Sequence, residues 1–154
     1  MRGAAALGVA ASIFGILACG AANVRPYVAP FAGAPIDTVR GDPAVIVGDL
    51  AGLLQAEGVT VRRQSPEEGY VESAWFDVRG TSLTGPTPHG PLVRFRFWVD
   101  PVGNGLAQVI GEVAGRYTVD PSLPERQREV LLPPEHVGRV VLARIMESVA
   151  LQFK

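Results

Sequence analysis

The first amphipathic pattern in the chain is the segment 41–58, GDPAVIVGDLAGLLQAEG, which predicts a helix. Its apolar side chains recur at spacings of three and four residues, so they fall on one helix face. These positions are Val47, Leu50, Ala51 and Leu54. Asp42 is a favoured N-cap residue, Pro43 suits the first helical position, and Gly58 is a natural stop at the other end.

A second helix is predicted near the C-terminus, over residues 135–153. Its apolar side chains are again three and four residues apart. This stripe consists of Val137, Val140, Val141, Ile145 and Val149. Each helix has one apolar face and therefore needs a surface to cover, which the segments between and before the helices supply.

Alternating apolar and polar positions in these other segments predict strands. The predicted strands are 36–40, 59–64, 70–78, 92–100 and 106–119. The clearest alternation is in LVRFRFWVD, where apolar side chains at the odd-numbered positions alternate with Arg94, Arg96 and Trp98. The next residues, PVGNG at 101–105, predict a hairpin turn that leads to the last strand.

The element order is therefore β-α-β-β-β-β-α, which defines an α+β fold. We expect a mainly antiparallel sheet of four or five strands, with both helices packed on one face and a wetter opposite face. On the last strand, Val109, Gly111, Val113 and Gly115 would point toward the helices. The two glycines would allow a helix to approach the sheet closely.

The wetter sheet face carries the candidate binding residues, which would form a ladder across neighbouring strands. They are Glu72, Arg94, Arg96, Trp98, Glu112 and Arg116. One interpretation is a solvated face with cross-strand ion pairs, each contributing up to about 1 kcal/mol. The other is a partner-binding surface, because an exposed tryptophan flanked by arginines is typical of interface hot spots. Trp98 would lose that role if the Pro-rich loop 79–91 covered it.

In the strand before that loop, apolar and polar side chains do not separate cleanly onto two faces. Strict alternation places Trp75 opposite Glu72, which predicts that Trp75 lies in the core. The same alternation places Tyr70 and Phe76 on the face of Glu72.

Residues 1–18 have a positive start and an uncharged apolar run that is too short to cross a hydrocarbon core of ~30 Å. This pattern predicts a secretory signal peptide. It ends in Ile16-Leu17-Ala18-Cys19, which resembles the bacterial lipobox. The resemblance implies cleavage after Ala18 and lipid attachment to Cys19, the one cysteine in the chain. The alternative is an ordinary signal peptide with an incidental cysteine.

The lipobox resemblance also bears on location, since Gly20 stands where Asp would be the inner-membrane retention signal. It therefore favours the outer membrane. The segment 19–35 is rich in Ala, Pro and Gly, which predicts an extended tether. Within it, Tyr27 and Phe31 would touch either lipid headgroups or the domain. The remaining residues, 36–154, form the single predicted domain.

Composition narrows the classes of function. The 154 residues include 14 basic and 15 acidic side chains, a net charge of −1, which argues against a nucleic-acid binder. One cysteine excludes an intramolecular disulfide, and neither His89 nor His136 begins a metal-ligand spacing, so we expect no metal or cofactor. No serine lies in a Gly-x-Ser-x-Gly elbow, and no nucleophile is paired with a base, so we expect no enzymatic activity.

Two motifs together resemble a known family. GYVESAW at 69–75 is followed by a strand with alternating Arg94 and Arg96. They resemble the BamC/NlpB-type outer-membrane assembly lipoproteins, in which a Gly-aromatic-Val/Ile-x-Thr-x-Trp stretch precedes such a strand, with Ser73 here at the Thr position. The similarity extends over residues 36–153. It implies a lipid-anchored, non-enzymatic periplasmic domain.

The leading hypothesis is a non-catalytic lipoprotein at the periplasmic face of the outer membrane. It would be anchored through Cys19 and would act as an interaction or accessory module for an envelope protein. The alternative is a binder of a small apolar ligand, with a pocket between helices and sheet near Gly111 and Gly115. An enzymatic hypothesis would require His89, His136 and a carboxylate to converge.

Overall fold

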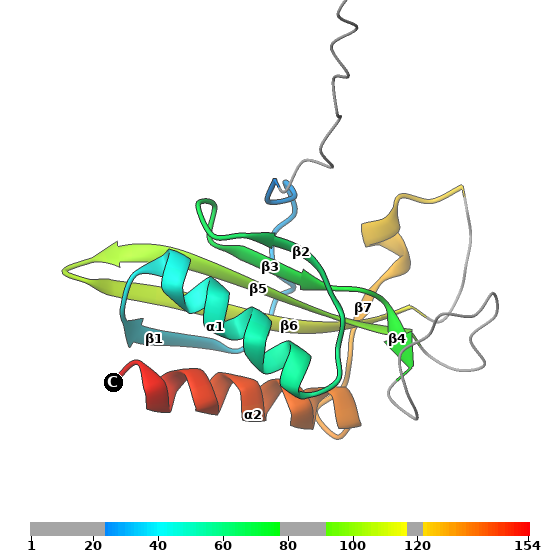
Figure 1. Ribbon diagram of the computed structural model, residues 1–154. Coiled ribbons are helices and arrows are strands. Elements are labelled where there is room, and N and C mark those ends of the chain that lie inside the picture. The colour runs from blue at the N-terminus through cyan, green and yellow to red at the C-terminus, as the bar shows by residue number, and fades with distance from the viewer. Residues whose placement is uncertain (1–23, 78–91, 117–121) are drawn as a thin grey trace, which may run out of the picture.

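The computed structural model describes residues 24–77, 92–116 and 122–154 (Figure 1). The helical elements are α1 (Pro43–Ala56), the short 3-10 helix η1 (Glu125–Arg128) and α2 (Val137–Gln152). The strands are β1 (Ile36–Arg40), β2 (Val61–Ser65), β3 (Tyr70–Ser73), β4 (Phe76–Asp77), β5 (Leu92–Gly103), β6 (Leu106–Arg116) and β7 (Val130–Leu131). They form one antiparallel sheet in the order β1-β6-β5-β3-β2, with β4 paired to β5 and β7 to β6. The predicted α+β fold is confirmed.

Both helices lie on the same face of the sheet, as predicted (Figure 1). The α1 helix begins where the sequence indicates, because the Asp42 side chain accepts a hydrogen bond from the Ala44 amide at 2.7 Å. Gly58 follows the helix with a φ of +75°, the left-handed conformation that glycine adopts readily. The predicted apolar face of α1 is buried against the strands.

The set of α2 residues that faces the sheet differs in part from the prediction. Val137 and Val140 are 48% and 53% exposed, whereas Leu142 and Met146 belong to the core together with the predicted Ile145 and Val149. The helix is rotated because Leu142 and Met146 are longer side chains that reach the sheet over Gly111. The predicted stripe is therefore wrong at Val137 and Val140 and confirmed at Ile145 and Val149, and Val141 is partly buried against the core.

The packing of α2 over Gly111 is tight, as the glycine predicted. A Cβ at this position would lie 3.0 Å from atoms of Leu142, Met146 and Phe97. Contacts of that length are shorter than normal packing, so these three side chains would have to shift to admit a larger residue. At Gly111 the glycine marks close packing between helix and sheet, and not room for a ligand.

The chain is irregular between β3 and β4, and the side chains that follow point to the sheet face opposite to the predicted one. Ala74 and Trp75 lie outside the strands, and the Ala74 amide donates to the Thr60 carbonyl. After this break Phe76 stacks on Phe95 at 5.5 Å and packs against the core, so its predicted position beside Glu72 is wrong. Trp75 correspondingly lies away from the core, because the irregular residues interrupt the two-residue period.

The sheet face opposite the helices is covered, so the prediction of a wetter face is wrong. Two segments cover it: residues 24–35, which we call the N-terminal strap, and residues 122–132, which include η1 and β7 (Figure 1). The strap falls in the predicted tether 19–35, yet it contacts the sheet. The Phe31 amide donates to Glu112 at 2.9 Å, and the Gly111 amide donates to Pro35 at 3.0 Å.

The predicted signal peptide, Cys19 and the loop 79–91 with His89 lie outside the described residues. Within the part of the chain that the structure describes, no helix is both long enough and apolar enough to cross a membrane.

Candidate functional site

Three of the predicted site residues are direct cross-strand neighbours. Glu72 on β3 is opposite Arg96 on β5, and Arg96 is opposite Glu112 on β6. The predicted ladder across adjacent strands is therefore present. Its exposure is not as predicted, because Glu72, Arg94, Arg96, Trp98 and Glu112 are at most 4% exposed.

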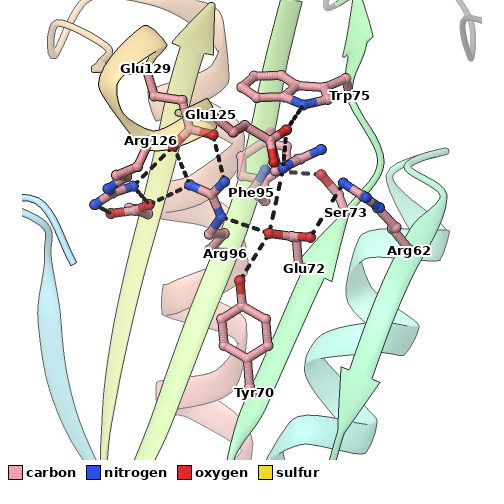
Figure 2. Close-up of polar contacts among 12 residues, drawn as sticks. Arg62, Tyr70, Glu72, Ser73, Trp75, Phe95, Arg96, Glu125, Arg126 and Glu129 are labelled. Carbon is pink, nitrogen blue, oxygen red and sulfur yellow. Dashed lines mark hydrogen bonds and ion pairs between the residues drawn. The ribbon is translucent and has the colours of Figure 1, made fainter. Parts of the chain in front are cut away.

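Arg96 is the centre of a buried set of ion pairs (Figure 2). Its Nε donates to Glu72 at 2.8 Å and its Nη1 donates to Glu112 at 3.0 Å. Nη1 and Nη2 also donate to both oxygens of Glu129, at 2.7 and 2.6 Å. One guanidinium thus satisfies three carboxylates, and the bidentate pair with Glu129 fixes its orientation.

Arg126 lies in η1, which covers the sheet face, and it bonds to two of the same carboxylates. It donates to Glu112 at 2.6 Å and to Glu129 at 3.2 Å. Its Nη2 also donates to the Ala29 carbonyl at 2.7 Å, and its guanidinium carbon lies 3.5 Å from the centre of the Phe31 ring. Arg126 therefore connects the strap to η1 and to the sheet, and Phe31 packs on the domain.

Arg94 is the second buried arginine of β5. Its Nη1 lies 3.0 Å from Glu125 and 3.6 Å from Glu72. Glu125 also accepts from Trp75 Nε1 at 3.0 Å, and the guanidinium groups of Arg94 and Arg116 lie 4.3 and 4.9 Å from the centre of the Trp75 ring. Trp75 is thus part of the charged side, which corrects the expectation that it lies in the core.

These residues form what we call the ion network. Its charged members are Glu72, Arg94, Arg96, Glu112, Glu125, Arg126 and Glu129. Tyr70 completes it, since its hydroxyl donates to Glu72 at 3.0 Å. Tyr70 also contacts Trp98 edge-to-face, with ring centres 5.6 Å apart. Trp98 has no exposed surface and cannot be an exposed hot spot.

The sequence did not identify three members of the network. Glu125, Arg126 and Glu129 lie in the segment ERQRE, which follows a Pro-rich stretch and has no strand or helix period of its own. Its alternation of opposite charges was the one available signal. Such runs are usually solvated, so only their placement over β5 and β6 reveals the role.

Burial and charge shift the pKa of the carboxyl groups in opposite directions. Burial alone would raise the pKa of Glu72, but the hydrogen bond from Arg96 and the charges of Arg94 and Arg96 prevail and lower it. For Glu125, burial is likewise outweighed by the Trp75 hydrogen bond and the Arg94 charge, so its pKa is also lowered. Burial raises the pKa of Tyr70, and the Glu72 charge adds to the effect, so its hydroxyl stays protonated as a donor.

A cleft of about 220 Å³ opens beside the network, between the strap, β2 and η1. Its lining consists of Pro26, Val28, Arg62, Arg63, Glu72, Arg96, Glu125 and Arg126. Arg62 is 49% exposed and reaches Glu72 only at 3.9 Å. Four further charged side chains of the lining, Glu72, Arg96, Glu125 and Arg126, are already bonded within the network.

Of the two histidines, the structure describes His136, which has a structural role. His136 caps α2, since its Nδ1 accepts from the Gly138 amide at 3.0 Å. In the described ranges, no group of three or more His, Cys, Asp or Glu side chains is placed to hold a metal ion. The arrangement can hold segments together and bury charge, with each acid matched to an arginine.

No family model and no curated protein matches the chain.

The lowered pKa values predict acid sensitivity. The unfolded chain takes up protons near the ordinary glutamate pKa of 4.5, whereas Glu72 and Glu125 in the folded protein resist protonation to lower pH. The stability that these groups contribute is therefore fully present above about pH 4.5. It is lost as the pH falls through the lower pKa values that the two groups have in the folded protein. We expect the unfolding free energy from urea titrations to fall steeply below pH 4.5.

The variant Glu72→Gln should be less stable at pH 7 and should lose part of this pH dependence, since one titrating group is gone. Glu67→Gln, an equal charge change in an exposed turn, is the control. An unchanged slope in Glu72→Gln would show that Glu72 is not a source of the acid sensitivity.

Proposed function

We propose that this protein is a non-catalytic lipoprotein of the bacterial cell envelope. It is anchored through lipid on Cys19 to the outer membrane, faces the periplasm, and acts as an interaction or accessory module, as the BamC/NlpB-like motifs suggest. The observation that carries the proposal is the position of the strap. Only five residues separate Cys19 from Arg25, which is already bonded to the domain.

The Arg25 contacts support an anchored role. Two guanidinium nitrogens of Arg25 donate to the two oxygens of Asp100, one of them at 3.0 Å, and the Arg25 amide donates to Glu68. The hydrogen bond to Asp100 and its charge raise the pKa of Arg25. A protein joined to a lipid through so short a segment stays at the membrane surface.

The ion network supports a structural role over a catalytic one. Its arginines and glutamates are bonded to one another, and catalysis would need at least one of them directed at a substrate. The alternative of an apolar ligand between helices and sheet has no support at Gly111, where Leu142, Met146 and Phe97 fill the space. The accessory module therefore remains the proposal.

Mass spectrometry of the membrane fraction tests the anchor. We expect the mature chain to begin at Cys19 with a diacylglyceryl thioether and an acylated amine. Cys19→Ser should keep residues 1–18 and lose labelling by a fatty-acid analogue, because serine does not supply the thiol. Gly20→Asp should keep the label and move the protein to the inner-membrane fraction. A mature chain that begins elsewhere with a free thiol would contradict the proposal.

A further inference from the structure

The N-terminal strap presents Tyr27 on the side of the molecule that faces the proposed anchor. The Tyr27 side chain is fully exposed, and Val24, three residues earlier, is 50% exposed. The Val28 amide donates to the Pro26 carbonyl at 2.8 Å, which makes Tyr27 the central residue of a three-residue turn. Such a turn projects its central side chain outward.

Contacts on both sides hold this turn in place. On one side Arg25 is bonded to Asp100 and Glu68, and on the other the Ala29 carbonyl accepts from Arg126 of the ion network. Because both ends of the turn are attached to the domain, Tyr27 has a fixed direction relative to the sheet. Figure 1 shows this end of the strap on the side away from α1 and α2.

The length of chain before the strap limits how far the domain can move from the lipid. Six residue steps connect Cys19 to Arg25, and at 3.3–3.6 Å per step they span at most about 22 Å. The attached end of the strap therefore cannot leave the neighbourhood of the bilayer surface. Tyrosine is enriched at membrane interfaces, where its ring lies among the headgroups and its hydroxyl stays hydrated.

We infer that the tip of the strap, Val24 to Val28 with Tyr27 at its centre, is a membrane-contact surface that inserts into the lipid headgroup region. This inference rests on the proposed lipid anchor at Cys19. It orients the domain with the strap-covered sheet face toward the bilayer and both helices toward the periplasm. The Arg25 guanidinium pairs with Asp100 and the Arg25 amide donates to Glu68, and the tip itself exposes the apolar and aromatic side chains of Val24 and Tyr27.

Tryptophan fluorescence in the intact lipidated protein tests this orientation. Tyr27→Trp places a reporter at the tip, and Val140→Trp places one on the outer face of α2, where the native valine is 53% exposed. Each variant is reconstituted in phosphatidylcholine vesicles with brominated acyl chains, and the emission of the parent protein, from Trp75 and Trp98, is subtracted.

We expect quenching by the brominated lipid to be at least about threefold greater for Tyr27→Trp than for Val140→Trp. Aqueous iodide should give the opposite order. Equal lipid quenching of the two reporters, or none at position 27, would overturn the inference when mass spectrometry of the same sample shows lipid on Cys19. A sample without lipid on Cys19 would instead overturn the anchor itself, and the inference with it.

Discussion

Arg96→Ala is expected to lower the free energy of unfolding by about 3–5 kcal/mol, because it removes the shared partner of three buried carboxylates. Glu72, Glu112 and Glu129 each accept a hydrogen bond from Arg96 at 3.0 Å or less. Without the guanidinium, these charges remain away from water with only part of their compensation. The loss is a penalty for unpaired buried charge, and it is larger than the net contribution of the intact pairs.

Urea denaturation followed by circular dichroism measures this effect. Arg144→Ala is the matched control, since Arg144 is 59% exposed and, among the described residues, pairs with Glu57 on the surface. It should cost less than about 1 kcal/mol. If Arg96→Ala does not fold, Arg96→Lys keeps the charge but loses the bidentate contact, and should be intermediate in stability. Equal stability of Arg96→Ala and Arg144→Ala would contradict a central role for Arg96.

Gly69→Ala is the second substitution with a large expected effect. Gly69 has a φ of +62°, its amide donates to Pro66, and its carbonyl accepts from the Val99 amide at 2.8 Å. A Cβ here would overlap the Val99 carbonyl oxygen and lie 3.0 Å from the carbonyl carbon. Because backbone atoms cannot rotate away, we expect a loss of about 3 kcal/mol or more of unfolding free energy.

Gly58→Ala separates the two causes of that loss. Gly58 has a similar positive φ of +75°, yet nothing lies within 4 Å of the position that a Cβ would occupy. Its substitution should cost only about 1–2 kcal/mol, the preference of alanine against the left-handed conformation. Thermal and urea unfolding of the two variants supply the comparison. Similar losses in both would show that the close approach of β5 to Gly69 is unimportant.

The ion network also explains how a polar sheet face can be covered without a second layer of helices. The 3-10 helix η1 brings no apolar side chain, and the mainly apolar strap is attached to the polar face through the bonds from the Phe31 amide to Glu112 and from Arg126 to the Ala29 carbonyl. We expect this network to specify a unique arrangement of the segments that it joins more than to add net stability. In this protein that arrangement fixes the position of the strap against β6.

Local signals in the sequence determined most of the elements. The Asp42 cap and the Gly58 stop act within a few residues of their own helix, and the alternation in β5 reports the two faces of one strand. Such patterns are sufficient because capping and pleating depend on neighbours in the chain. They predicted the α+β fold, the shared face of Glu72, Arg96 and Glu112, and the close approach of a helix at Gly111.

Tertiary structure decided what covers each face. The rotation of α2 depends on which side chains reach Gly111, and the position of Trp75 depends on a break between β3 and β4 that no local period announces. The cover over Arg96 joins residues far apart in sequence: Arg126 bonds to Ala29 across 97 positions, and Glu112 bonds to Phe31 across 81. A periodic pattern in the sequence indicates that one face of a strand is polar. It does not indicate which distant segment will supply the charges and carbonyl groups that bond to that face.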